Sequence, residues 1–171
     1  MRDLGKLALA LSATAGLLAL AAPTFASEQV KNSGTHKCLD VRSQDNYLAN
    51  GARVQQYHCT GVDEQQWTAV YVESQNALNY YYLVSKRSGK CMTVGDNASN
   101  QNGAQIIQYE CQMGAPQMWR FEVVDPPGTT YHLVNLFSSK CLDLNDDLPN
   151  DGEKIQIWDC NYSVPAQKWV F

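Results

Sequence analysis

The sequence predicts an all-β fold made of three similar repeats, with about twelve short strands in total and one disulfide bond in each repeat. A Lys-Cys pair, a second cysteine and a Gln-x-Trp motif recur in the same order with a period of about fifty residues. All six cysteines belong to this pattern. Apolar residues alternate over short segments and show no helical period of useful length.

The three copies occupy approximately residues 27–76, 77–127 and 128–171. Together they form one expected domain, 27–171, which is large enough to bury a core but leaves no room for a separate catalytic domain. The repeated residues are Lys37-Cys38, Cys59 and Gln65-x-Trp67; Lys90-Cys91, Cys111 and Gln117-x-Trp119; and Lys140-Cys141, Cys160 and Gln167-x-Trp169.

Residues 1–26 have the pattern of a secretory signal peptide. Arg2 and Lys6 begin it, an apolar run rich in Leu and Ala covers 7–22, and small residues lead to Ala26. A transmembrane anchor is the weaker interpretation, because the run is short and contains few bulky residues. We therefore expect a secreted, extracellular product, in a compartment where disulfide bonds persist.

The charge of the chain argues against several kinds of partner. It has 13 Lys and Arg residues against 17 Asp and Glu residues, a net charge of −4, and no basic run. Such a chain has no electrostatic footprint for nucleic acid or for anionic lipid. No second apolar stretch predicts insertion into a membrane.

Each copy is expected to contain four strands. The turn signals Asn50-Gly51, Asn102-Gly103 and Asp151-Gly152 separate the second strand from the third in each copy. The expected strands are 29–32, 38–41, 54–57 and 67–72; 82–85, 91–94, 106–109 and 119–124; and 132–135, 141–144, 155–158 and 169–171.

The repeat also selects a disulfide pairing, because only pairing within each copy treats the three copies alike. Each bridge is expected to stabilise the fold by roughly 3 kcal/mol. A metal site is the weaker interpretation, because the cysteines form no Cys-x-x-Cys motif and the three histidines share no repeat position. We therefore expect no metal or other cofactor. The expected bridges are Cys38–Cys59, Cys91–Cys111 and Cys141–Cys160.

At this point the residues resemble a known family. Cys38-Leu39-Asp40-Val41, Val54-Gln55-Gln56-Tyr57-His58-Cys59 and Gln65-Gln66-Trp67 are similar to the motifs of a ricin B-type lectin domain. The same family includes the family 13 carbohydrate-binding modules of secreted glycosidases. The resemblance covers essentially all of 27–171. It implies a β-trefoil, a six-stranded barrel capped by three hairpins.

The Gln-x-Trp motif is interpreted as structural. Three indoles at equivalent positions are best placed in the shared hydrophobic core. The resemblance implies that the glutamines, here Gln65 and Gln167, support the binding hairpins through hydrogen bonds.

The resemblance implies a sugar site made from an aspartate, a glutamine, an aromatic residue and an asparagine. A carboxylate accepts hydroxyl protons, an amide both donates and accepts, and an aromatic ring stacks on the apolar face of a sugar. The first copy has Asp40, Gln55 and Tyr57, but Glu64 replaces the asparagine and can only accept hydrogen bonds.

The other two copies differ from each other. The third has Asp143, Gln156 and Trp158, but Ala166 replaces the asparagine. The second has Thr93 for the aspartate and Ile107 for the glutamine and keeps only the ring of Tyr109, so we expect it to be silent. An isolated aspartate usually stabilises a turn. The joint presence of aspartate, glutamine and aromatic residue in the first and third copies, and the joint loss of the aspartate and glutamine in the second, favours sugar binding instead.

Catalysis is not expected. The sequence has no Ser-His-Asp signature, no phosphate-binding loop and no zinc motif. The paired carboxylates Asp146-Asp147 lie in a loop rich in Pro and Asn, where solvated charge is the ordinary explanation.

The sequence therefore predicts a secreted, non-catalytic lectin that binds galactose-like or xylan-like sugars, as a glycan or polysaccharide, through its first and third copies. Two alternatives remain open. In the first alternative, the trefoil has lost useful sugar affinity and binds a protein as an inhibitor. In the second, it is an accessory subunit of a separate secreted glycosidase or toxin.

Overall fold

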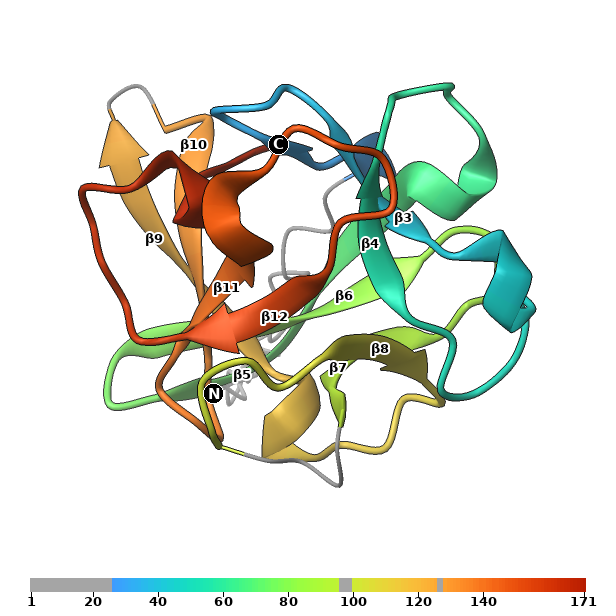
Figure 1. Ribbon diagram of the computed structural model, residues 1–171. Helices are drawn as coiled ribbons and strands as arrows, with labels where there is room; N and C mark the ends of the chain where they lie inside the picture. The colour runs from blue at the N-terminus through green and yellow to red at the C-terminus, as the bar shows by residue number, and fades with distance from the viewer. Residues whose placement is uncertain (1–25, 96–99, 126–127) are drawn as a thin grey trace, which may run out of the picture.

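The computed structural model describes residues 26–95, 100–125 and 128–171. The predicted signal peptide, apart from Ala26, lies outside these residues. The described chain is built almost entirely from strands, connected by short 3₁₀ turns (Figure 1). The strands are β1 (Glu28–Gln29), β2 (Lys31–Asn32), β3 (Cys38–Val41), β4 (Val54–Tyr57), β5 (Gln66–Gln75), β6 (Leu78–Ser85), β7 (Cys91–Val94), β8 (Ile106–Tyr109), β9 (Trp119–Asp125), β10 (Thr130–Asn135), β11 (Cys141–Leu144), β12 (Ile155–Trp158) and β13 (Trp169–Val170).

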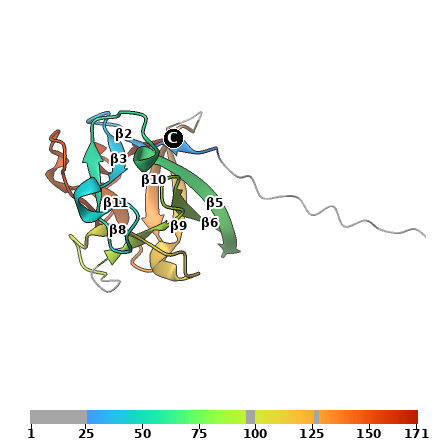
Figure 2. The ribbon, with the colours of Figure 1, turned by 90° about the vertical axis from the view of Figure 1, so that its right-hand side faces the viewer.

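A closed barrel forms the centre of the molecule. Strand β5 pairs with β6, β6 with β9, β9 with β10, and β10 with β13, all antiparallel. The N-terminal segment closes the circle, because β1 pairs with β5 and β2 pairs with β13. Figure 2 shows the long β5–β6 hairpin on one side of this barrel.

The N-terminal strand differs in detail from the expectation. The sequence predicted one strand over 29–32, whereas the structure has two short strands on either side of Val30. Val30 is buried, and its carbonyl accepts a hydrogen bond from the Leu39 amide at 2.8 Å. The segment therefore changes partner from β5 to β13 at this residue, so the predicted twelve strands become thirteen among the described residues.

Three hairpins, β3–β4, β7–β8 and β11–β12, complete the predicted β-trefoil. The turn glycine of each hairpin adopts a positive φ, as the predicted turns require: 85° at Gly51, 88° at Gly103 and 85° at Gly152. The amide of Gly51 donates to the Gln108 carbonyl at 2.9 Å, and the amide of Gly152 donates to the Gln56 carbonyl at 2.8 Å. Each of these two turns therefore contacts a strand of another hairpin.

The core confirms the structural role of the Gln-x-Trp motif. Trp67, Trp119 and Trp169 are fully buried, and each indole nitrogen donates to a carbonyl of the first hairpin strand of its own copy, at 3.0 to 3.2 Å. The cysteines pair as predicted, Cys38–Cys59, Cys91–Cys111 and Cys141–Cys160. Because these bridges join the start of one hairpin strand to the segment after the other, they close each hairpin at its base.

Candidate functional site

One candidate site is a cavity of about 780 Å³ on the third hairpin, which we call the third pocket. Asp143 on β11 and Gln156 on β12 face each other in register and form its floor, where Gln156 Nε2 donates to Asp143 Oδ1 at 2.9 Å. Trp158 at the end of β12 is 44% exposed, an unusual position for an indole. The pocket therefore combines a buried carboxylate with an exposed aromatic face.

Two amides hold the carboxylate of Asp143. In addition to Gln156, Gln167 Nε2 donates to Asp143 Oδ2 at 2.9 Å and to the Asp159 carbonyl at 3.0 Å. Burial raises the pKa of Asp143 above its ordinary value, although the hydrogen bonds from both glutamines oppose this change. Both oxygens are therefore fixed in position, and each keeps a lone pair for a further donor.

The equivalent cavity on the first hairpin, the first pocket, has a volume of about 280 Å³. Its floor repeats the same pair, because Gln55 Nε2 on β4 donates to Asp40 Oδ1 on β3 at 2.8 Å. Burial raises the pKa of Asp40, and hydrogen bonds from Gln55 and Gln65 oppose the change. Gln65 also holds the segment after β4, donating to the His58 carbonyl at 2.9 Å and accepting from the Thr60 amide at 2.7 Å.

Glu64 lines the first pocket but does not stand alone there. Arg87, from the turn between β6 and β7, places its Nε 3.3 Å from Glu64 Oε1. The same guanidinium lies 4.7 Å from the centre of the Tyr47 ring and donates to the Tyr47 hydroxyl at 3.1 Å. The Arg87 guanidinium therefore lies beside two residues that line the first pocket, Tyr47 and Glu64, and compensates the charge of Glu64.

The second hairpin lacks this arrangement. The Thr93 hydroxyl donates to the Cys91 carbonyl at 3.0 Å and accepts from Gln117 Nε2 at 2.9 Å, so it is occupied within the protein. Ile107 pairs with Thr93 across the hairpin and offers no polar group. Tyr109 keeps a ring that is 37% exposed, but the two positions that carry the aspartate and the glutamine in the other hairpins are Thr93 and Ile107 here.

Two buried glutamines position the loops beside the two polar pockets. Gln108 Nε2, on β8, donates to the carbonyls of Tyr47 and Ala49 in the loop of the first hairpin, both at 2.9 Å. Gln56 Nε2, on β4, donates to the carbonyls of Leu148 and Asn150 in the loop of the third hairpin, at 2.8 and 2.9 Å. The corresponding residue on β12 is Ile157, which is buried and has no amide.

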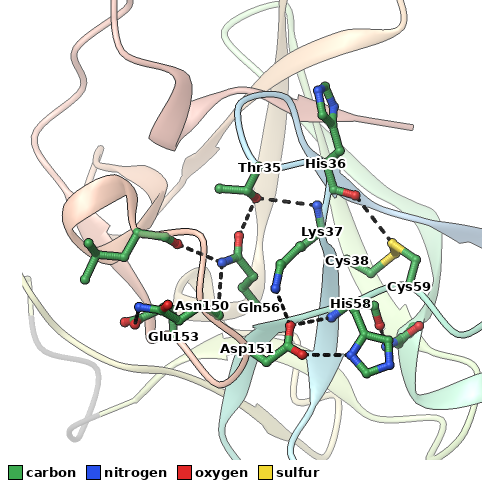
Figure 3. Close-up of polar contacts among 12 residues, drawn as sticks. Thr35, His36, Lys37, Cys38, Gln56, His58, Cys59, Asn150, Asp151 and Glu153 are labelled. Carbon is green, nitrogen blue, oxygen red and sulfur yellow. Dashed lines mark hydrogen bonds and ion pairs between the residues drawn. A yellow bond between two sulfur atoms is a disulfide. The ribbon is translucent and has the colours of Figure 1, made fainter.

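A second contact anchors the third loop to the first hairpin (Figure 3). Asp151, at the hairpin turn, accepts from Lys37 Nζ at 2.5 Å and from the His58 amide at 2.8 Å. Its other oxygen lies 2.8 Å from His58 Nδ1. The His58 ring in turn lies 4.5 Å from the ring of Tyr57, which lines the first pocket. The loop of one pocket is therefore attached beside the ring of the other.

A sequence model of the family described as "Ricin-type beta-trefoil lectin domain" matches residues 26–169. The chain belongs to this family. Ricin-type lectin domains are generally non-catalytic and bind carbohydrate, which supports a carbohydrate-binding role for this chain.

Solved structures similar to this lectin domain include ThreeFoil, a designed protein with threefold symmetry. It is 34% identical, with a TM-score of 0.73, and the match covers 84% of this chain and 96% of that one. The exo-β-1,3-galactanase 1,3Gal43A of Clostridium thermocellum is 28% identical, with a TM-score of 0.74, over 84% of this chain but 29% of that enzyme. Ribosome-inactivating protein PMRIPt of Polygonatum multiflorum is 24% identical over 114 residues, which are 64% of this chain and 19% of that protein.

The structure brings the predicted site residues into two separate groups. Asp40, Gln55, Tyr57, Glu64 and Gln65 line the first pocket. The other four, Asp143, Gln156, Trp158 and Gln167, line the third.

Sequence reasoning missed several residues around the pockets. Asn161 lines the third pocket and brings a side-chain amide to a site where Ala166 had removed the expected one. Gln56 and Gln108 could have been noticed, because a glutamine recurs at the same phase in two copies and becomes Ile157 in the third. Arg87 could not have been noticed, because nothing in the sequence of its own repeat indicates that it borders the pocket of another repeat.

Among residues 26–95, 100–125 and 128–171, no helix is long and apolar enough to cross a membrane. Within the same ranges, no group of three or more His, Cys, Asp and Glu side chains is arranged to hold a metal ion.

Proposed function

We propose that the chain is a secreted, non-catalytic lectin that binds galactose-like or xylan-like sugars through the first and third pockets. The observation that carries this proposal is the buried Asp143–Gln156 pair beneath the exposed indole of Trp158. The carboxylate of such a pair accepts hydrogen bonds from sugar hydroxyls, and the glutamine amide donates to them. The indole covers the apolar face of the sugar ring. The Asp40–Gln55 pair with Tyr57 offers the same chemistry on a smaller scale.

The proposal includes residues 1–26 as a removable secretory leader and 27–171 as a single domain of three repeats, approximately 27–76, 77–127 and 128–171. Three disulfide bonds and membership of the lectin family favour an extracellular location.

Affinity at each site is expected to be weak. A shallow site with a few hydrogen bonds and one stacking ring corresponds to a Kd of about 1 mM, or about −4 kcal/mol. Two sites on one rigid body raise the apparent affinity for a polysaccharide when both reach it together.

The test is a titration of 27–171 with galactose, lactose and xylo-oligosaccharides, with NMR shifts and tryptophan fluorescence as readouts. Trp158 makes the fluorescence specific for the third pocket, because the other three of the four tryptophans are buried in the core. Asp143→Ala should abolish binding at the third pocket only, and Asp40→Ala at the first only. No response of the wild-type protein to any sugar on a broad glycan array would refute the proposal.

A targeting role is a second candidate. The galactanase match covers 29% of that enzyme, so a similar trefoil occurs there as one part of a larger glycosidase. Here the lectin would hold a separate secreted enzyme close to its polysaccharide. Co-purification of the secreted protein with a glycosidase that remains bound in the presence of free sugar would support this role.

A further inference from the structure

The third pocket has an acidic lining without a basic counterpart. Asp146 and Asp147, in the 3₁₀ turn after β11, line the pocket together with Asp143. None of its lining residues is Lys, Arg or His. Asp143, Gln156 and Trp158, which carry the proposed sugar site, lie on the hairpin strands β11 and β12 and not in this turn.

The carboxylates of this pocket differ in how they are compensated. Asp159, on its rim, pairs with Lys140 and accepts from Asn102 Nδ2 at 2.8 Å. Asp146 accepts a hydrogen bond from the neutral amide of Asn145 at 3.0 Å. In the part of the chain that the structure describes, neither Asp146 nor Asp147 has a Lys, Arg or His within ion-pair distance.

The negative charge of this pair reaches the floor of the pocket. Burial is the main reason that the pKa of Asp143 is raised, and the two glutamine amides act in the opposite direction. The charges of Asp147 and Asp146 raise the same pKa further. The three carboxylates therefore share one electrostatic environment.

The first pocket shows how such charge is neutralised elsewhere in the same fold. Arg87, four residues before Cys91, pairs there with Glu64. The matching residue four before Cys38 is Gly34, and a Cβ atom at Gly34 would lie 3.5 Å from Asp147 Oδ1. Position 34 therefore borders the third pocket as position 87 borders the first, but it supplies no cation.

Packing explains why a glycine occupies this position. A Cβ atom at Gly34 would lie 2.8 Å from Pro165 Cβ, closer than side chains pack. The turn that could have carried a neutralising arginine is thus too close to the segment after β12. That close approach excludes a side chain at position 34 that could neutralise Asp147.

We propose that the third pocket selects sugars that carry a protonated primary amine, such as galactosamine or oligomers of glucosamine, and that Asp146 and Asp147 determine this preference. The inference rests on the proposed function, since it names the class of sugar for the same pocket. A sugar ring lies on Trp158 with its hydroxyls at Asp143 and Gln156, and its ammonium group lies toward the two free carboxylates.

An ion pair at a partly exposed site is modest in strength, and two neighbouring carboxylates add to it. We expect galactosamine to bind about fivefold more tightly than galactose, and galacturonic acid more weakly than either. Because the interaction is electrostatic, added salt should reduce the preference.

The experiment titrates the protein with galactose, galactosamine, N-acetylgalactosamine and galacturonic acid at about pH 6, where the amine is protonated. Trp158 fluorescence reports the third pocket. N-acetylgalactosamine controls for the substituent without its charge. The test variant is Asp146→Asn/Asp147→Asn, which suits the positive φ of 53° at both residues because asparagine tolerates this conformation. The matched control, Glu28→Gln/Asp125→Asn, removes two charges from exposed residues that do not line the pocket.

The preference for galactosamine should disappear in the test variant and persist in the control, whose galactose affinity stays within about twofold of the wild-type value. Equal binding of galactose and galactosamine by the wild-type protein would overturn the inference. So would an unchanged preference in the test variant, or competition by ethanolamine as strong as that of galactosamine. A failure of the proposed function is distinct, because then no sugar of any charge would change Trp158 fluorescence.

Discussion

Replacing Gln56 by isoleucine should weaken the third pocket, although Gln56 lies on a strand of the first hairpin. The buried side chain donates to the carbonyls of Leu148 and Asn150 and accepts from the Thr35 hydroxyl at 2.5 Å (Figure 3). Isoleucine is the natural residue at the equivalent position, Ile157, so the strand tolerates its shape. The substitution removes the link to the loop and leaves the strand intact.

The size of the effect follows from the lost contacts. Each hydrogen bond contributes about 1 kcal/mol net, and the carbonyls of the loop regain water because Leu148 and Asn150 are exposed. Isoleucine recovers part of the loss by burying apolar surface. We expect Gln56→Ile to lower the free energy of unfolding by about 2 kcal/mol and the melting temperature by roughly 4–8 °C. The loosened loop should lower the sugar affinity of the third pocket about fivefold.

Urea unfolding measures the stability change, and Trp158 fluorescence with NMR shifts measures each pocket separately. The matched variant is Gln108→Ile, which should weaken the first pocket and leave the third within about twofold. The reasoning is refuted if Gln56→Ile weakens only the first pocket, to which its neighbours Gln55 and Tyr57 belong. It is also refuted if both variants affect both pockets equally, because that would indicate general destabilisation.

Three further predictions concern the binding groups and the frame. Acidification should weaken sugar binding before it unfolds the protein, because the raised pKa values of Asp40 and Asp143 cause these acceptors to protonate above the ordinary aspartate value of 3.8. Their contribution to stability has the opposite sign: it is fully present below the unfolded pKa and is lost as pH rises through the folded pKa. Sugar affinity and stability in urea, measured in one pH series, test the two opposite pH dependences. A sugar affinity that stays constant while Asp40 and Asp143 titrate would contradict their assignment as sugar-binding acceptors. Trp158→Ala should lower the sugar affinity of the third pocket roughly two- to tenfold by removing the stacking surface. The loss of stability should be small because the ring is exposed. NMR shifts measure the affinity, and an unchanged affinity would exclude stacking. Cys91→Ser/Cys111→Ser should lower the free energy of unfolding by about 3 kcal/mol, since the bridge closes a loop with a sequence separation of 20. Urea unfolding measures this change. An unchanged midpoint would show that the bridge does not restrain the unfolded chain.

The repeated part of the fold was predictable because its causes are local and occur three times. A cysteine at each hairpin base, a glycine turn and a buried indole recur at one phase, so the disulfides and hairpins follow from the sequence. The split at Val30 was not predictable in this way. It arises because the N-terminal strand must close the barrel between two partners, and only the assembled barrel shows where the change occurs.

The floor of each pocket was also predictable, because its aspartate and glutamine lie in register on one hairpin. The rim was not, because its residues come from another repeat. Glu64 looked like a carboxylate that had lost a donor, whereas Arg87 from the next repeat compensates its charge. Asp147 looked like ordinary solvated charge, whereas it lies next to Gly34 in a pocket where no ion pair to it forms among the described residues.

These contacts give the second hairpin, which we expect to bind no sugar, a supporting role for the first pocket. Its strand β8 carries Gln108, which holds the loop of the first pocket, and the turn before β7 carries Arg87, which borders that pocket. The first hairpin supports the third pocket in the same way through Gln56. The second repeat therefore keeps structural contacts with the first pocket, although Thr93 and Ile107 stand where the other two repeats have an aspartate and a glutamine. Substitutions on its inter-repeat face should reduce binding at the first pocket, although we expect the second hairpin itself to make no contact with sugar.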